Sequence, residues 1–236
     1  GTWRMPFLLS QGEYVMLSPE VVLERIGQYG VVPVIALESA DGALRLADAL
    51  WEGGLPIVEI TFRTEAAAEA IRRIAQHRPE MLVGAGTLLR PEQVEAARAS
   101  GAQFGVAPGL SPQVLRRAQE LKMPFLPGVA TASEIEQALS LGCRWVKYFP
   151  AEAMGGVKML QALWGPFAHT GLRFVPTGGI SEANLAQYIG LRCVAAVGGT
   201  WIAKSDDIAA GRWTEITQRC QNALRIVAQV RSAAGH

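Results

Sequence analysis

The chain has 236 residues, half of them hydrophobic, and a formal net charge of +1 at pH 7. This length suits one large α/β domain or two small ones, with ample surface to bury in a core. The near-neutral balance without a dense Lys/Arg block argues against a nucleic-acid binder, and no apolar run approaches the ~18–20 residues of a membrane span.

Cysteine and histidine are too sparse for a disulfide framework or a metal centre. Cys143, Cys193 and Cys220 are isolated and do not form a CxxC motif. An odd count without a framework predicts structural thiols in a reducing compartment, so we expect a cytoplasmic protein. The three histidines are scattered along the chain, which does not favour a metal cluster or a histidine-based triad.

Residues 1–16 are expected to be a tail outside the folded domain. Their short apolar piece is not preceded by the basic region of a signal peptide. Position 1 is not methionine, and Gly1-Thr2 is typical of a remnant of an expression vector. We therefore expect one domain over residues 17–236.

A helix is predicted after Ser18, with serine as its N-cap, Pro19 at its first position and Gly30 at its end. From residue 31 one pattern recurs, in which a short apolar strand is followed by a helical segment and then by a glycine. The predicted strands are 31–37, 56–62, 81–87, 104–108, 124–129, 145–149, 173–177 and 194–198. The predicted helices are 40–53, 65–77, 91–100, 112–121, 132–141, 156–164, 182–189 and 212–232.

Eight such units with nearly continuous apolar strands indicate a parallel sheet covered by helices. In this length they close most naturally into a single (β/α)8 TIM barrel with an extra N-terminal helix. An open doubly wound sheet is the alternative. No linker, low-complexity tract or charge block divides the chain.

Polar residues alternate with apolar ones along the second predicted strand. Ile57, Glu59, Thr61 and Arg63 share one face, because side chains alternate with a period of two. In a barrel this face points inward and becomes polar toward the carboxyl ends of the strands, where active sites lie. The alternative is an internal Glu59–Arg63 pair with only a structural role.

The sixth predicted strand carries a lysine, Lys147, on the same face as Trp145 and Phe149. A lysine here could lie on an edge strand or extend its ammonium group to water. Alternatively it is an amine nucleophile, because apolar surroundings disfavour the charged form of an amine. Glu59, pointing into the same space, would then act as general acid and base.

Glycine pairs follow the seventh and eighth predicted strands, in Thr177-Gly178-Gly179 and Gly198-Gly199-Thr200. Backbone N–H groups in such loops surround anions, and a short helix starting at Ser205 could aim its N-terminus at the same place. This arrangement predicts a phosphate on the ligand. The alternative is that these are tight turns without a ligand. Thr87 and Pro108, at the ends of earlier strands, could likewise belong to ordinary turns.

Several short stretches occur in a characteristic order along the chain: Val32-Pro33-Val34-Ile35, Val58-Glu59-Ile60-Thr61-Phe62-Arg63-Thr64, Val83-Gly84-Ala85-Gly86-Thr87-Leu88, Ala107-Pro108-Gly109-Leu110, Val146-Lys147-Tyr148-Phe149-Pro150-Ala151-Glu152, Gly155-Gly156-Val157-Lys158, Pro176-Thr177-Gly178-Gly179-Ile180 and Gly198-Gly199-Thr200-Trp201. With these motifs the chain resembles, from about Val31 to Arg231, the class I aldolases for 2-keto-3-deoxy-6-phosphogluconate (KDPG). That family includes bifunctional enzymes that also cleave 4-hydroxy-2-oxoglutarate (KHG) to pyruvate and glyoxylate.

The resemblance implies a role for each matching residue. Lys147 would form a Schiff base with the keto carbon and Glu59 would move protons. The substrate carboxylate would be held by Arg63, Thr87 and Thr177, and the phosphate by Gly178, Gly179, Gly199 and Thr200. Pro108 and Phe149 would line the pocket. The family also implies a homotrimer that acts on a keto acid phosphate and needs neither metal nor cofactor.

Two positions depart from the pattern of the family. Thr200 stands where several relatives carry serine, which keeps the hydroxyl and adds a methyl group, and Met154 stands where asparagine is common. Arg63-Thr64 and Thr177-Gly178-Gly179 favour a gluconate over a galactonate type. The alternatives are a galactonate-type aldolase, an epimerase or synthase acting on a sugar phosphate, and a catalytically idle barrel that serves as an oligomeric scaffold.

Overall fold

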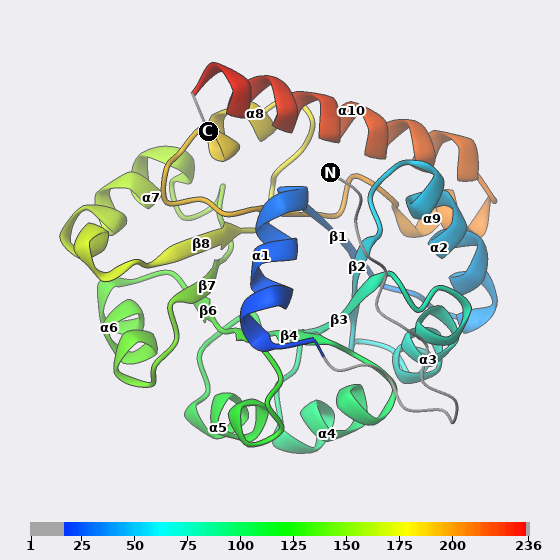
Figure 1. Cartoon of the computed structure of the whole chain (residues 1–236), viewed down its shortest axis with the longest axis horizontal. Coiled ribbons are helices and arrows are strands. Elements are labelled where there is room, and N and C mark those ends of the chain that lie inside the picture. Colours follow the sequence, from blue (N-terminus) through cyan, green and yellow to red (C-terminus); the bar gives the residue numbers. More distant parts are fainter. Residues whose placement is uncertain (1–16, 235–236) are drawn as a thin grey trace.

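The chain folds into an α/β structure with its strands in the middle and its helices outside (Figure 1). A computed structural model describes residues 17–234. The predicted tail of residues 1–16 lies outside the described residues. None of the helices in the described part is long and apolar enough to cross a membrane.

All strand pairs within the described residues are parallel and belong to two sheets. The larger sheet contains, in spatial order, β5 (Phe125–Leu126), β4 (Phe104–Val106), β3 (Leu82–Gly86), β2 (Ile57–Thr61), β1 (Val31–Ile35) and β9 (Val197–Gly199). The smaller sheet contains β6 (Gly128–Val129), β7 (Trp145–Tyr148) and β8 (Arg173–Pro176).

The prediction of one strand over 124–129 was wrong, because this segment forms the two short strands β5 and β6 with Pro127 between them. Proline has no N–H group to donate and interrupts the ladder. The extended segment therefore pairs with β4 before Pro127 and with β7 after it. At the other edge, isolated parallel bridges join Phe174 to Val194 and Thr177 to Gly198.

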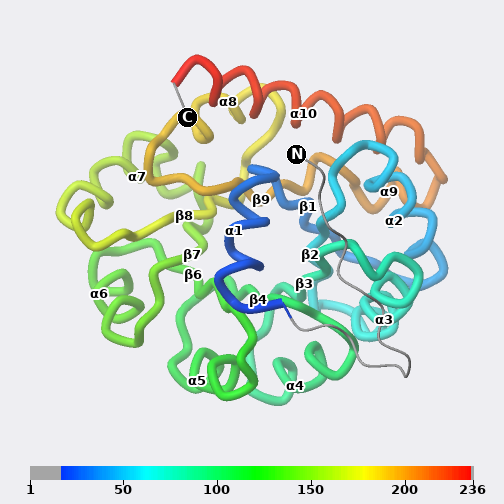
Figure 2. The backbone as a smooth tube through the Cα atoms, in the orientation of Figure 1, coloured from blue at the N-terminus to red at the C-terminus, as the bar shows by residue number. Residues whose placement is uncertain are grey.

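The helices form a layer around the strands, as Figures 1 and 2 show. Most of them follow the predicted positions to within a few residues. Short 3-10 helices cover Ala40–Gly42 and Gly165–Thr170. The α-helices are α1 (Pro19–Tyr29), α2 (Ala43–Glu52), α3 (Ala67–His77), α4 (Pro91–Ala99), α5 (Pro112–Glu120), α6 (Ala132–Ser140), α7 (Gly156–Trp164), α8 (Leu185–Ile189), α9 (Ser205–Ala209) and α10 (Trp213–Ala233).

The helix predicted after Ser18 begins where it was expected, whereas the helix predicted over 182–189 begins later. Ser18 caps α1, and its hydroxyl accepts a hydrogen bond from the N–H of Val21. The helix predicted over 182–189 does not begin after Ser181, because α8 begins at Leu185. The side chain of Asn184 accepts a hydrogen bond from the N–H of Ser181 at 2.8 Å, so residues 181–184 form a local turn instead.

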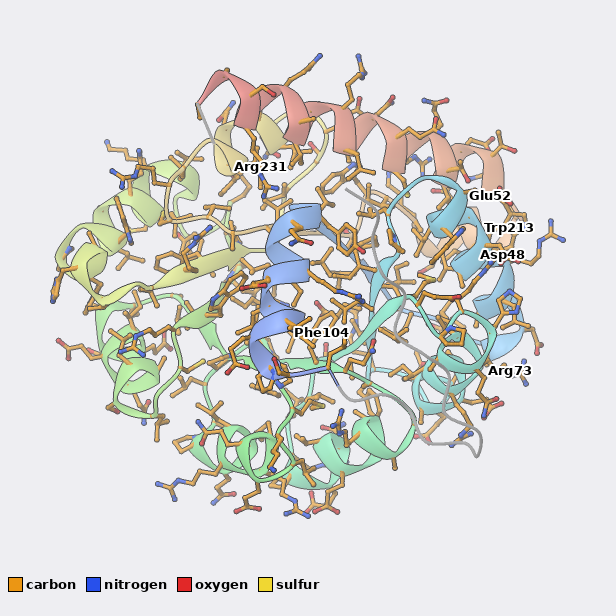
Figure 3. The ribbon with its side chains drawn as sticks, in the orientation of Figure 1. Asp48, Glu52, Arg73, Phe104, Trp213 and Arg231 are labelled. Carbon is orange, nitrogen blue, oxygen red and sulfur yellow. The ribbon has the colours of Figure 1, made fainter. Side chains whose placement is uncertain are left out.

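Helix α1 lies across the amino ends of the strands, in front of them in Figure 1. Gly27 of α1 packs against the ring of Trp145, the first residue of β7. Arg231 extends from α10 toward α1 (Figure 3) and donates hydrogen bonds to the carbonyls of Gly27 and Ala195. Gly30, with a φ of +73°, lets the chain turn directly from α1 into β1.

Side chains fill the space between the strands on the side of α1. Phe104, labelled near the centre of Figure 3, pairs in register with Gly84 of β3. A Cβ atom on Gly84 would lie 2.2 Å from the Phe104 ring, so the glycine makes room for the aromatic side chain. The ring of Phe104 therefore fills the interior beside Gly84.

Asp207 links the short helix α9 to α10. Its carboxylate is 4% exposed and accepts hydrogen bonds from Arg219 and Arg212. The hydrogen bond from Arg219, with that from Arg212, lowers the pKa of Asp207 from 3.8 to about 2. A carboxyl group with a lowered pKa in the folded state stabilises the fold above its ordinary pKa and loses this effect as the pH falls.

We expect the Asp207→Asn variant to melt about 3–6 °C lower than the unmodified chain at neutral pH, because charge-assisted hydrogen bonds are lost. The difference should shrink as the pH falls from about 4 toward 2, where Asp207 itself becomes protonated. Thermal unfolding followed by circular dichroism at several pH values measures both effects. The neighbouring exposed Asp206→Asn variant is the matched control, and equal melting points for the two variants would contradict this account.

Candidate active site

Lys147 lies inside the structure on β7. The residue is only 6% exposed, and its Nζ atom lies 4.8 Å from the centre of the Phe149 ring. Its neighbour in register is Gly128 of β6. Of the two aromatic residues predicted to lie on the face of Lys147, Phe149 is therefore close to the ammonium group. Trp145 lies at the opposite end of the strand, next to Gly27 and Arg173.

Glu59 is buried on β2 with 4% of its surface exposed. Its Oε1 atom has no hydrogen-bond partner among the described residues. Burial raises the pKa of Glu59, and the positive charges of Lys147 and Arg63 oppose this rise. A Cβ atom on Gly86 would lie 2.0 Å from Oε1, so this glycine leaves room for the carboxyl group. An unpartnered buried carboxyl group is costly and available for proton transfer.

A cavity of about 290 Å³ opens at the carboxyl ends of the strands. Nine of the predicted site residues line it together, although they come from the carboxyl ends of six different strands or from the residues that follow them. They are Arg63, Thr87, Pro108, Lys147, Phe149, Thr177, Gly178, Gly179 and Thr200.

Two predicted site residues are not part of this lining. Glu59 lies behind the surface of the cavity, within the electrostatic reach of Lys147 and Arg63. Gly199 is absent from the lining, and a Cβ atom added there would lie 1.9 Å from the Trp201 ring. Its neighbour Gly198 lines the cavity in its place.

The cavity also contains residues that were not predicted as site residues: Val34, Thr61, Ile180 and Gly198. Thr61 is 3% exposed and its hydroxyl accepts a hydrogen bond from Nε of Arg63 at 3.2 Å. The period of two along the second strand already placed Thr61 on the face of Glu59 and Arg63, so this signal was sufficient to find it.

The glycine loop after β8 has two consecutive residues in the left-handed region of the backbone. Gly178 and Gly179 have φ values of +103° and +76°, which glycine adopts without steric cost. Successive N–H groups in such turns can converge on an anion. Among the described residues, the short helix α9 adds nothing to the cavity lining.

Within residues 17–234 there is no cluster of three or more His, Cys, Asp and Glu side chains arranged to hold a metal ion. The three cysteines are buried, and burial raises their pKa values, to about 11 for Cys143 and Cys193 and about 12 for Cys220.

A parallel β/α fold with a buried lysine and a buried carboxyl group beside one cavity is typical of lyases that act on carbonyl compounds. The chain belongs to the KDPG and KHG aldolase family, whose model matches residues 22–219. Members of this family are carbon–carbon lyases.

Individual relatives cover nearly the whole matched region. The chain is 45% identical to the 2-dehydro-3-deoxy-phosphogluconate aldolase of Haemophilus influenzae over 210 residues, 89% of this chain and 98% of the relative. It is also 45% identical to the KHG/KDPG aldolase of Escherichia coli K12, over 82% of this chain and 90% of the relative.

A solved structure shows the same fold at lower identity. KDPG aldolase from Legionella pneumophila, with pyruvate captured as a covalent carbinolamine intermediate, superposes with a TM-score of 0.82 and 38% identity. The superposition covers 88% of this chain and 98% of the Legionella chain.

Proposed function

We propose that this chain is a class I aldolase that reversibly cleaves KDPG to pyruvate and D-glyceraldehyde 3-phosphate. The observation that carries the proposal is the buried Lys147, which shares one cavity with the Gly178-Gly179 loop. Membership of the KDPG and KHG aldolase family supports it. An imine-forming amine and an anion-binding loop at two places in one cavity suit a keto acid with a distant phosphate.

We further propose that the strands form one closed (β/α)8 barrel with α1 as an extra N-terminal helix, and that residues 17–236 are a single domain. The continuous segment of β5 and β6 supports closure, because it pairs with both sheets. The bridges of Phe174 with Val194 and of Thr177 with Gly198 support it at the other edge.

In the proposed mechanism the amine of Lys147 attacks the keto carbon of the substrate, and loss of water gives a protonated imine. The C3–C4 bond then breaks, its electron pair moves into the imine to form an enamine, and the C4 hydroxyl loses its proton to release the aldehyde. Protonation of the enamine carbon and hydrolysis of the imine release pyruvate. Glu59 would carry the protons in these steps, as its buried position beside Lys147 allows.

The remaining site residues would bind and orient the substrate. Arg63, Thr87 and Thr177 are proposed to hold the carboxylate of the pyruvate portion, with Thr61 orienting Arg63 through its hydrogen bond. Gly178, Gly179, Gly199 and Thr200 are proposed to bind the phosphate. Binding at this remote group positions the bond that breaks, while Pro108 and Phe149 provide apolar walls.

Membership of the KDPG and KHG aldolase family and similarity to the KHG/KDPG aldolase of Escherichia coli favour KHG as a second substrate. Its pyruvate portion would react at Lys147 in the same way and release glyoxylate. By resemblance to the family we also propose a cytoplasmic homotrimer that works without a metal or cofactor.

Trapping with pyruvate tests the proposed function. Incubation with pyruvate and borohydride should reduce the imine and leave a stable adduct, which peptide mass mapping would locate on Lys147. The same preparation should cleave KDPG, with pyruvate release followed through a coupled dehydrogenase. A chain that cleaves KDPG without an adduct would rule out imine chemistry, and an adduct on another lysine would rule out Lys147.

A further inference from the structure

Glu152 and Tyr188 form a hydrogen-bonded pair next to the Gly178-Gly179 loop, which lines the cavity. Glu152 follows the lysine strand β7 in the turn that leads to α7, and Tyr188 is fully buried in α8. The hydroxyl of Tyr188 donates a hydrogen bond to the Oε1 atom of Glu152. Burial and the neighbouring carboxylate both raise the pKa of Tyr188, so its hydroxyl stays protonated and remains the donor.

The same glutamate holds the glycine loop after β8. Its N–H group donates a hydrogen bond to the carbonyl of Gly178 at 3.1 Å. The stem of its side chain packs on Gly179, where an added Cβ atom would lie 2.6 Å from the Cβ of Glu152. On its other side the carboxylate lies against Gly156, where an added Cβ would be 3.1 Å from Oε1. The Oε1 atom of this exposed glutamate therefore lies between Gly156 and Tyr188.

Further hydrogen bonds connect this loop to the lysine strand. The N–H of Thr177 donates to the carbonyl of Tyr148, the residue after Lys147, at 2.9 Å, and the N–H of Ala151 donates to the carbonyl of Thr177 at 2.8 Å. These bonds end at Thr177. Gly178 and Gly179 are held by Glu152, and the side-chain amide of Asn184 donates a further hydrogen bond to the carbonyl of Gly179 at 3.1 Å. Two consecutive glycines have more backbone freedom than any other pair, so fixing them costs entropy unless a neighbour already holds them.

We propose that Glu152 and Tyr188 are a positioning pair that pre-orders the Gly178-Gly179 loop for the phosphate end of the substrate. This inference rests on the proposed function, because it concerns the same cavity. Glu152 touches the loop, and neither residue of the pair lines the cavity. Pre-ordering lowers the entropic cost of binding at that loop, so loss of the pair weakens phosphate binding and leaves imine formation at Lys147 unchanged.

The Tyr188→Phe variant removes one hydroxyl and keeps the ring. We expect the KM for KDPG to rise about five- to tenfold, since a hydrogen bond to a charged group is lost, with kcat within about twofold of the unmodified chain. Binding of inorganic phosphate, measured by calorimetry, should weaken by the same factor. The pyruvate concentration that gives half-maximal borohydride trapping should not change.

Two glutamate variants and a control make the result specific. Glu152→Ala should weaken phosphate binding as much as Tyr188→Phe does. Glu152→Gln should recover part of the affinity, because an amide oxygen still accepts from Tyr188. The double variant Glu152→Ala with Tyr188→Phe should bind phosphate no more weakly than either single variant. Tyr29→Phe, in the distant helix α1, is the matched control and should leave all values unchanged. Circular dichroism verifies that each variant is folded.

Unchanged phosphate affinity in Tyr188→Phe and Glu152→Ala would overturn the positioning role, as would an equal loss for phosphate and for pyruvate. If Tyr188→Phe does not fold, the comparison of Glu152→Ala with Glu152→Gln decides. The proposed function fails separately, when the unmodified chain traps no pyruvate. The phosphate titrations do not depend on that result and still test the pair.

Discussion

The Lys147→Met variant is expected to lose aldolase activity by about 10⁴-fold or more while retaining its fold, because the nucleophile is removed. Methionine has nearly the length of lysine and no charge, and position 147 is only 6% exposed. An apolar side chain removes the cost of enclosing an ammonium group. We therefore expect the free energy of unfolding to stay equal or to increase.

Borohydride trapping and thermal unfolding of the same sample measure both effects. Lys158→Met is the matched control, since Lys158 is an exposed lysine on the nearby helix α7. The control should keep full activity and the full yield of the pyruvate adduct. A folded Lys147→Met variant that still forms the adduct would show that another amine is the nucleophile.

The Glu59→Gln variant is expected to lower kcat by about 10²–10⁴-fold, which is the usual contribution of general acid–base catalysis. The amide keeps the shape of the side chain beside Gly86 but cannot exchange a proton. Exchange of the methyl protons of pyruvate in deuterated water, followed by NMR, isolates the enamine step from the rest of the reaction. It should fall by a similar factor, whereas the exposed Glu24→Gln in α1 should have no effect.

The pH dependence identifies the same group. Burial raises the pKa of Glu59 from its ordinary value of 4.5, so a reaction that needs the carboxylate loses rate as the pH falls through this raised pKa. The fall in kcat on the acid side of the pH profile should thus have its midpoint above pH 4.5. This fall should be absent in Glu59→Gln. A profile that is unchanged in the variant would contradict a proton-transfer role.

Much of the fold could be predicted from hydrophobic periodicity and glycine positions, and the helices that follow the strands lie close to their expected ranges. The division into β5 and β6 at Pro127 could not be predicted. An apolar run that contains proline looks like one strand until the strands that pair with its two halves are known. The start of α8 was also misplaced, because the hydrogen bond between Ser181 and Asn184 competes with a helix cap that has the same local sequence.

The lining of the cavity was largely predictable. The alternation of side chains along a strand shows which of them point inward, and position at the carboxyl end of a strand shows which of them reach the cavity. Lys147, Arg63 and Thr87 all line the cavity on this basis. Long-range packing decided the remainder. The ring of Trp201 occupies the space beside Gly199, and the link between Glu152 and Tyr188 spans 36 residues. Neither contact leaves a local pattern in the sequence.

The closure of the amino side by α1 and Phe104 has a practical consequence for attaching the protein to other molecules. Leu17, where the described chain starts, leads into α1, and the cavity lies at the opposite ends of the strands. A linker ahead of α1 would tether the molecule by its closed side and leave the opening facing the solution. Immobilisation on a bead or an electrode through this end should therefore preserve access for small molecules.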